Sequence, residues 1–174
     1  MTSSKAHNEA FVWLWLSGAA EPVVAGKLEA DDQGRVLFNY GKSYLQRIGA
    51  EPAAIAIYEP ELPPRAGILP LLDGLTMPGC IRDAAPDAWG RRVIINKMLG
   101  RRGTDIDALS ELTYLLESGS DRIGALDFQR SPTEYVPRSV NNASLEELLQ
   151  SAERVERGAP LTPELDQALF HGTS

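Results

Sequence analysis

The start of the chain alternates short apolar segments with turn-forming residues, a pattern that predicts an antiparallel sheet. Residues 11–16 (Phe-Val-Trp-Leu-Trp-Leu) are apolar at successive positions, as expected of a strand covered on both faces. Residues 23–29 and 35–40 fit two further strands, and the polar turn 31–34 between them is typical of a hairpin. This spacing predicts an antiparallel meander rather than βαβ units.

The middle of the chain carries weaker signals. Residues 43–49 fit one or two helical turns, and 55–58 (Ile-Ala-Ile-Tyr) fit a short strand. Four prolines within residues 60–70 hold the next stretch extended. Glu59 and Glu61 lie among these prolines, and we expect both carboxylates to be solvated rather than paired for acid–base chemistry.

A first amphipathic helix is predicted to start around Asp83 and Pro86 and to end at Gly100, since proline is tolerated in a first turn. Apolar and basic residues recur in it at helical spacing. These residues are Trp89, Val93, Ile94, Lys97 and Met98.

A second helix is predicted over about 107–117, with Gly119 as its C-cap, and residues 123–128 then return to the sheet. Its inward face consists of leucines. They are Leu109, Leu112, Leu115 and Leu116.

The last part of the chain predicts a linker and a helical pair. The polar, proline-containing stretch 129–143 is typical of a linker. Ser144 opens a capping box, and the helix it begins ends at Gly158. A further helix begins at 162–164 (Thr-Pro-Glu). The predicted class is α+β: a small antiparallel, barrel-like meander with packed helices. We expect a disordered lead (1–9), a subdomain (10–128), a linker (129–143) and a helical pair (144–174).

Composition narrows the function classes. The net charge of −7 argues against direct, nonspecific binding to nucleic acid or to an anionic membrane. The apolar run 11–16 is far too short to span a bilayer. Cys80 is the only cysteine, so no internal disulfide can form, and we expect a cytoplasmic, reducing compartment. One basic cluster is either a solvated helix face or a docking surface for an acidic partner. It comprises Arg91, Arg92, Lys97, Arg101 and Arg102.

Two segments combine turn chemistry with charge and an apolar anchor. In residues 86–92 (Pro-Asp-Ala-Trp-Gly-Arg-Arg), Gly90 costs about 1 kcal/mol relative to Ala inside a helix, which suggests that another backbone approaches closely. In residues 118–126 (Ser-Gly-Ser-Asp-Arg-Ile-Gly-Ala-Leu), the pair Gly124-Ala125 suggests tight packing of a strand under a neighbour. Taken singly, these residues also fit an ordinary helix start and an ordinary turn.

In order and spacing, the two segments resemble the N-terminal region of HipA-type serine/threonine kinases, the toxins of bacterial type II toxin–antitoxin pairs. That family's pattern includes a Pro-Asp-x-Trp-Gly-Arg-Arg helix start, followed by a Gly-x-Asp-Arg-x-Gly-Ala-Leu turn and strand. The matching residues are Pro86, Asp87, Trp89, Gly90, Arg91, Arg92, Gly119, Asp121, Arg122 and Gly124. The resemblance covers roughly residues 10–174, is best between 71 and 128, and implies a small N-terminal subdomain leading into a kinase core.

The resemblance also gives the C-terminal residues a role. In the family, the chain at this place enters a phosphate loop whose serine can be autophosphorylated, which expels the loop from the ATP site. Ser174 occupies the matching place at the start of that loop and is the candidate serine, Thr173 beside it is a second candidate, and Gly172 is the glycine of this loop start. Without the resemblance, these residues would be read as a frayed terminus.

No catalytic residue is predicted in this chain. It has no phosphate-binding Gly-x-x-x-x-Gly-Lys-Ser/Thr loop and no His-Arg-Asp string, and neither His7 nor His171 has a partner suggestive of catalysis or metal binding. In the family, ATP and Mg²⁺ are bound by residues of the complete kinase that come after the phosphate loop.

Three functions follow as expectations. The first is the N-terminal portion of a HipA-like kinase toxin acting on a translation-related protein such as an aminoacyl-tRNA synthetase, with a surface facing a DNA-binding, HipB-like helix-turn-helix antitoxin. The second is a stand-alone regulator that binds and neutralises a split HipA-like kinase core. The third is a small antiparallel domain that binds an unrelated protein.

Overall fold

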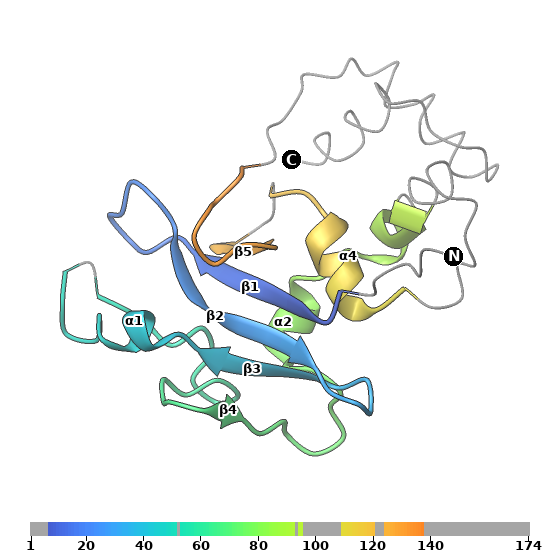
Figure 1. The fold of residues 1–174 in the computed structure, drawn as a ribbon, viewed down its shortest axis with the longest axis horizontal. Helices are drawn as coiled ribbons and strands as arrows, with labels where there is room; N and C mark the ends of the chain where they lie inside the picture. The colour runs from blue at the N-terminus through green and yellow to red at the C-terminus, as the bar shows by residue number, and fades with distance from the viewer. Residues whose placement is uncertain (1–6, 52, 93, 96–108, 121–123, 138–174) are drawn as a thin grey trace, which may run out of the picture.

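The computed structural model describes residues 7–51, 53–92, 94–95, 109–120 and 124–137 of the chain. Their centre is a five-stranded antiparallel sheet in the order β4-β3-β2-β1-β5 (Figure 1). The strands are β1 (Glu9–Leu14), β2 (Val23–Ala30), β3 (Val36–Tyr40), β4 (Ile68–Leu69) and β5 (Leu126–Gln129). The helices are α1 (Lys42–Leu45), α2 (Gly79–Asp83) and α4 (Glu111–Glu117), with a further helical stretch at 88–92.

The α+β class and the antiparallel meander are confirmed, and the first three strands begin and end within two residues of their predicted bounds. The barrel-like shape is not found in the described residues. In that part of the chain, β4 and β5 are the two edge strands and are not paired with each other, so the five strands form an open sheet.

The register separates a buried row from an exposed one. Ala10, Leu28, Phe38 and Leu69 are cross-strand neighbours in four successive strands, and each is at most 1% exposed. The next residue along each of these strands points its side chain to the other face of the sheet, because successive residues of a strand alternate between the two faces. That second row ends at Ile68, which is 63% exposed. Figure 1 shows α2 behind β1 and β2, on the face that carries the core.

A glycine in β2 leaves room for an aromatic ring of β3 to lie over β2 on the core face of the sheet. A Cβ placed on Gly26 would lie 2.4 Å from the Asn39 carbonyl oxygen and 2.5 Å from Phe38 Cζ. No side chain fits there, so Gly26 is required for Phe38 to reach the core.

The predicted strand at 55–58 is wrong, because tyrosine hydroxyls replace a strand partner. The Tyr40 hydroxyl accepts a hydrogen bond from the Ile57 N–H (3.0 Å) and donates one to the Leu62 carbonyl (2.8 Å). The Tyr44 hydroxyl does the same with Ile55, accepting from its N–H (3.2 Å) and donating to its carbonyl (2.9 Å). The backbone polar groups are thus satisfied without a ladder.

Two predicted helix starts need correction. Asp83 ends α2 instead of opening a helix, and the next helical stretch begins at residue 88. The other predicted helix, α4, starts at Glu111, because Ser110 caps it by accepting a hydrogen bond from the Thr113 N–H (3.2 Å). The leucines expected to face inward from it at 112, 115 and 116 are buried.

The described part of the predicted linker packs against residues of β1 and β5. Trp13 Nε1 donates a hydrogen bond to the Ser131 carbonyl (3.0 Å), and the ring centroids of Trp13 and Tyr135 lie 5.3 Å apart. Gln129 Nε2 also donates to the Val136 carbonyl (3.1 Å). Whether a domain boundary falls within 129–143 stays a prediction, and the helical pair at 144–174 lies outside the described residues. Within the described residues, no helix has the length and apolar character needed to cross a membrane.

Candidate functional site

The first motif segment forms a tightly capped helix start. The Asp87 carboxylate accepts a hydrogen bond from the Gly90 N–H (2.8 Å), which makes Asp87 the N-cap of the helical stretch that follows. A Cβ on Gly90 would lie 2.9 Å from Pro86 Cβ and 3.4 Å from the capping oxygen of Asp87. The close neighbour of Gly90 is therefore the Pro86 ring and not another backbone, which corrects the expectation from the sequence.

Arg91 joins this helix start to α4. Its Nη1 and Nη2 donate to the two carboxylate oxygens of Glu111, at 2.8 Å each, and its Nε donates to the Pro86 carbonyl (3.2 Å). The guanidinium carbon also lies 4.5 Å from the ring centroid of Tyr114. The hydrogen bonds that Arg91 donates to the Glu111 carboxylate raise the pKa of Arg91 above its ordinary value. We call these four residues (Pro86, Arg91, Glu111 and Tyr114) the Arg91 joint.

The second motif segment leaves the opposite end of α4. The Ser118 hydroxyl donates to the Leu115 carbonyl (2.9 Å), and Ser118 takes the C-cap position with extended backbone angles. Gly119, which the sequence placed at the C-cap, is the buried residue after it. The two motif segments are therefore linked through one short helix, and α4 packs against β1 and β5.

Gly124 is needed for its backbone conformation and not for close packing. Its φ is +120°, a conformation that side-chain-bearing residues rarely adopt, and no atom lies within 4 Å of a Cβ placed there. Gly124 and Ala125 are both exposed, so the expected tight packing under a neighbouring strand is wrong.

The remaining motif residues divide by exposure. Trp89 is half-buried, whereas Arg92 is exposed and has no ion pair among the described residues. Of the predicted basic cluster, only Arg91 and Arg92 lie in the described part of the chain. The following predicted residues lie outside it: Lys97, Arg101, Arg102, Asp121, Arg122, Gly172, Thr173 and Ser174.

A second polar contact was missed from the sequence. Glu61, expected to be solvated, is half-buried and accepts a hydrogen bond from the Cys80 N–H (3.0 Å) at the start of α2. The carboxylate thus satisfies a free N–H at a helix N-terminus. Burial, together with the charge of Glu61, raises the pKa of the Cys80 thiol to about 12. At this pKa the thiol is protonated at neutral pH, which disfavours its reaction as a nucleophile.

In the described part of the chain, the Arg91 joint positions two helices relative to each other. No group of three His, Cys, Asp or Glu side chains is placed there to hold a metal ion. Glu111 and Tyr114 were not predicted as site residues, because Arg91 and Glu111 are 20 residues apart and no short motif links them. The one available signal was the capping sequence Ser110-Glu111 at the start of α4.

Comparison with known protein families identifies the family of this chain. The family model for the HipA N-terminal domain matches residues 16–129, a range that includes both motif segments and the four strands β2 to β5, while β1 precedes it. The chain belongs to this family, which places it in the context of HipA-like toxins. No curated protein matches the chain.

Proposed function

We propose that this chain is the N-terminal portion of a cytoplasmic HipA-like serine/threonine protein kinase toxin whose target is a translation-related protein such as an aminoacyl-tRNA synthetase. The observation that supports this most directly is the family match over residues 16–129. In this role the described residues form a scaffold, and the phosphoryl-transfer groups belong to the kinase core.

The scaffold's work is to present a fixed surface to the kinase core and to a DNA-binding, HipB-like antitoxin. The Arg91 joint supports this role, because a bidentate arginine–carboxylate pair holds two helices in one orientation. Arg92 follows directly in sequence and is exposed, so we expect its guanidinium to contact an acidic surface of a partner.

Nucleotide binding is assigned to the complete kinase. Residues 172–174 would contribute the start of the phosphate loop, with Ser174 or Thr173 as the autophosphorylated residue. ATP and Mg²⁺ would be held by residues of the core beyond that loop, and the Mg²⁺ ion would neutralise the charge that develops on the transferred phosphoryl group.

A stand-alone regulator of a split HipA-like kinase is the second candidate. It is favoured by the hydrophobic cluster of the described residues, which runs from Ala10 to Phe128 and joins the sheet to α2 and α4. A unit with its own core can act in trans.

The two candidates are separated by supplying a HipA-like kinase core in trans. Titration calorimetry would measure binding of the full chain to the core, and a phosphorylation assay would measure the core's activity with and without the chain. A scaffold restores or raises activity, whereas a regulator lowers it. No binding would contradict both.

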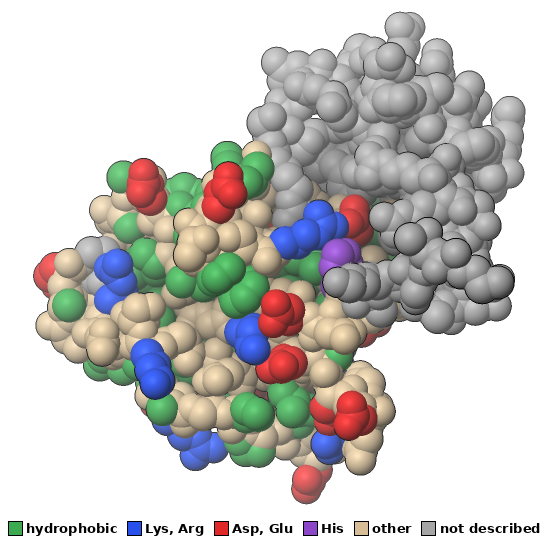
Figure 2. All heavy atoms as spheres, viewed as in Figure 1, with side chains coloured by type: hydrophobic (Ala, Val, Ile, Leu, Met, Phe, Trp, Pro, Cys, Tyr) green, Lys and Arg blue, Asp and Glu red, His purple; other side chains and the backbone are tan. Residues whose placement is uncertain are grey.

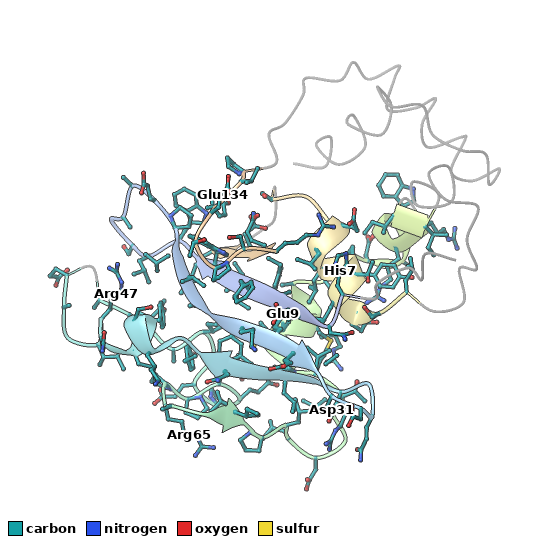
Figure 3. All side chains as sticks on the ribbon, viewed as in Figure 1. His7, Glu9, Asp31, Arg47, Arg65 and Glu134 are labelled. Atoms are coloured by element: carbon teal, nitrogen blue, oxygen red, sulfur yellow. The ribbon has the colours of Figure 1, made fainter. Side chains whose placement is uncertain are left out.

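A matched pair of variants tests the surface. Arg92→Glu should weaken binding to the core, while Arg65→Glu makes the same charge change at an exposed residue beside β4 (Figure 3) and should leave binding unchanged. Equal loss in both variants would indicate a nonspecific charge effect instead of the proposed surface.

A further inference from the structure

The outer face of the sheet carries a groove beside β4. Two hollows of about 510 and 250 Å³ adjoin there and share Leu37 and Ile68 in their walls. The larger continues along residues 68–75, and the smaller reaches Lys27 and Asn39. We call the two together the β4 groove.

Exposed aliphatic side chains line the β4 groove. Ile68 is 63% exposed and Leu72 is 50% exposed, and both line the larger hollow with Leu37. Single exposed aliphatic residues are ordinary on a protein surface, whereas several that share one hollow mark an interaction site. In Figure 2 hydrophobic side chains lie among charged ones along the edge where Figure 1 places β4.

Among the described residues, one carboxylate that lines the groove forms no ion pair. Lys27 Nζ pairs with Glu29 (3.0 Å) and with Glu9 (3.7 Å), and Arg35 pairs with Asp31 (2.8 Å). Both cations of the groove are thereby engaged. Asp73 is exposed in the wall of the larger hollow and has no ion pair among the described residues. The groove therefore favours a cation from outside.

Strand addition at this edge is blocked. β4 has only two residues, Gly67 before it takes a left-handed φ of +92°, and Pro70 after it has no N–H to donate. An occupant must bind through its side chains across the groove and not as a further strand.

The same charges argue against two occupants. In residues 138–174 of this chain, acidic residues outnumber basic ones six to three, so that segment is a poor electrostatic match. A second copy of the chain carries the same net charge of −7 and is repelled for the same reason.

We infer that the β4 groove binds a basic, aliphatic segment of a partner protein, with an aliphatic side chain on Ile68 and Leu72 and a lysine or arginine facing Asp73. This inference does not depend on the proposed function, since it uses only the walls and charges of the groove.

A random heptapeptide library displayed on phage, selected on the full chain, provides the probe. Selected peptides should combine an aliphatic residue with a lysine or arginine. The tightest one, made synthetically, should bind Ile68→Ser about tenfold more weakly, since about 1.4 kcal/mol of apolar contact is lost. Asp73→Asn should weaken it about threefold and reduce its salt dependence. Val136→Ser, which removes a similarly exposed aliphatic side chain outside the groove (53%, against 63% for Ile68), should bind as the original chain does.

Three outcomes would overturn the inference. Selected peptides could be acidic, or they could bind the Ile68→Ser chain as tightly as the original. Alternatively, sedimentation could show that the chain self-associates and that Ile68→Ser abolishes this, which would assign the groove to a second copy. Because Ile68 and Asp73 are exposed, all variants should keep the circular dichroism spectrum of the original, and this check separates lost binding from lost folding.

Discussion

Arg91 and Glu111 form a two-point ion pair, with both nitrogen–oxygen distances at 2.8 Å, between segments 20 residues apart. The pair connects the helix start of the first motif with the first residue of α4, whose other end leads into the second motif. The first motif segment thus has an architectural role, because its Arg91 fixes how two helices meet.

Arg91→Lys should lower the free energy of unfolding by about 1 kcal/mol, because lysine keeps the charge but cannot bind both oxygens and stack on Tyr114. The side chains of Arg91 and Glu111 are 30% and 38% exposed, so the loss is smaller than for a buried pair. Urea denaturation measures it, and a double-mutant cycle with Glu111→Gln should give a coupling energy of about 1 kcal/mol.

The matched control for that pair is Arg82, which lies 3.9 Å from Asp83 with both side chains mostly exposed. Arg82→Lys should change the free energy of unfolding by less than about 0.5 kcal/mol. Equal effects at Arg82 and Arg91 would contradict a special role for the Arg91 joint.

Gly26→Ala should destabilise the chain by about 3 kcal/mol, because the added Cβ would meet the backbone oxygen of Asn39 at 2.4 Å and the ring of Phe38. Gly41→Ala is the control: its nearest neighbour to an added Cβ is 3.7 Å away, and the change should cost less than about 1 kcal/mol. Thermal unfolding of both variants measures the difference, and a tolerated Gly26→Ala would show that the register of β2 and β3 is wrong.

Cys80 should react with iodoacetamide at pH 8 at least about tenfold more slowly in the folded chain than in the urea-unfolded chain, because its pKa is raised from 9.0 to about 12. Glu61→Gln removes the neighbouring negative charge, lowers the thiol pKa and should speed the reaction without unfolding the protein. Equal folded and unfolded rates would mean that the thiol is not shielded.

Tyr40→Phe should lower the free energy of unfolding by about 2 kcal/mol, because the Ile57 N–H and the Leu62 carbonyl lose their shared partner. Tyr58→Phe, at a hydroxyl-bearing residue that is 49% exposed, should change it by less than about 0.5 kcal/mol. Urea titrations of both variants give the comparison, and similar losses would leave residues 55–57 without the support assigned to them.

Alkaline pH should destabilise the chain through the same tyrosine. Burial raises the pKa of Tyr40 from 10.0 to about 12. The unfolded chain therefore ionises first, and the stability from this group is full below pH 10.0 and is lost as the pH rises toward about 12. The loss between these pH values should be smaller in Tyr40→Phe. An unchanged pH profile would contradict burial of the neutral hydroxyl.

The strands were predictable because their signal is local. Residues 11–16, 23–29 and 35–40 carry the apolar runs and turn residues that set an antiparallel meander, and each lies within two residues of an observed strand. Gly26 shows the limit of such patterns. Its glycine is visible in the sequence, but the reason for it, the Phe38 ring, comes from the neighbouring strand.

Several of the misses share one physical cause, which is that distant side chains satisfy backbone polar groups. The segment 55–58 has strand composition, yet Tyr40 and Tyr44 supply its hydrogen bonds. Helix α2 is only five residues long, and its start is stabilised by Glu61, far outside any helix-sized window. Likewise, Arg91 could be recognised as part of a motif, while its partner Glu111 required the fold.

The most direct test of the central claim, that this chain is a scaffold without its own nucleotide chemistry, is calorimetric titration of the full chain with ATP and Mg²⁺. We expect no saturable heat of ATP binding at millimolar ATP, and no transfer of phosphate from radiolabelled ATP. Stoichiometric binding, or phosphotransfer by the purified chain alone, would contradict it.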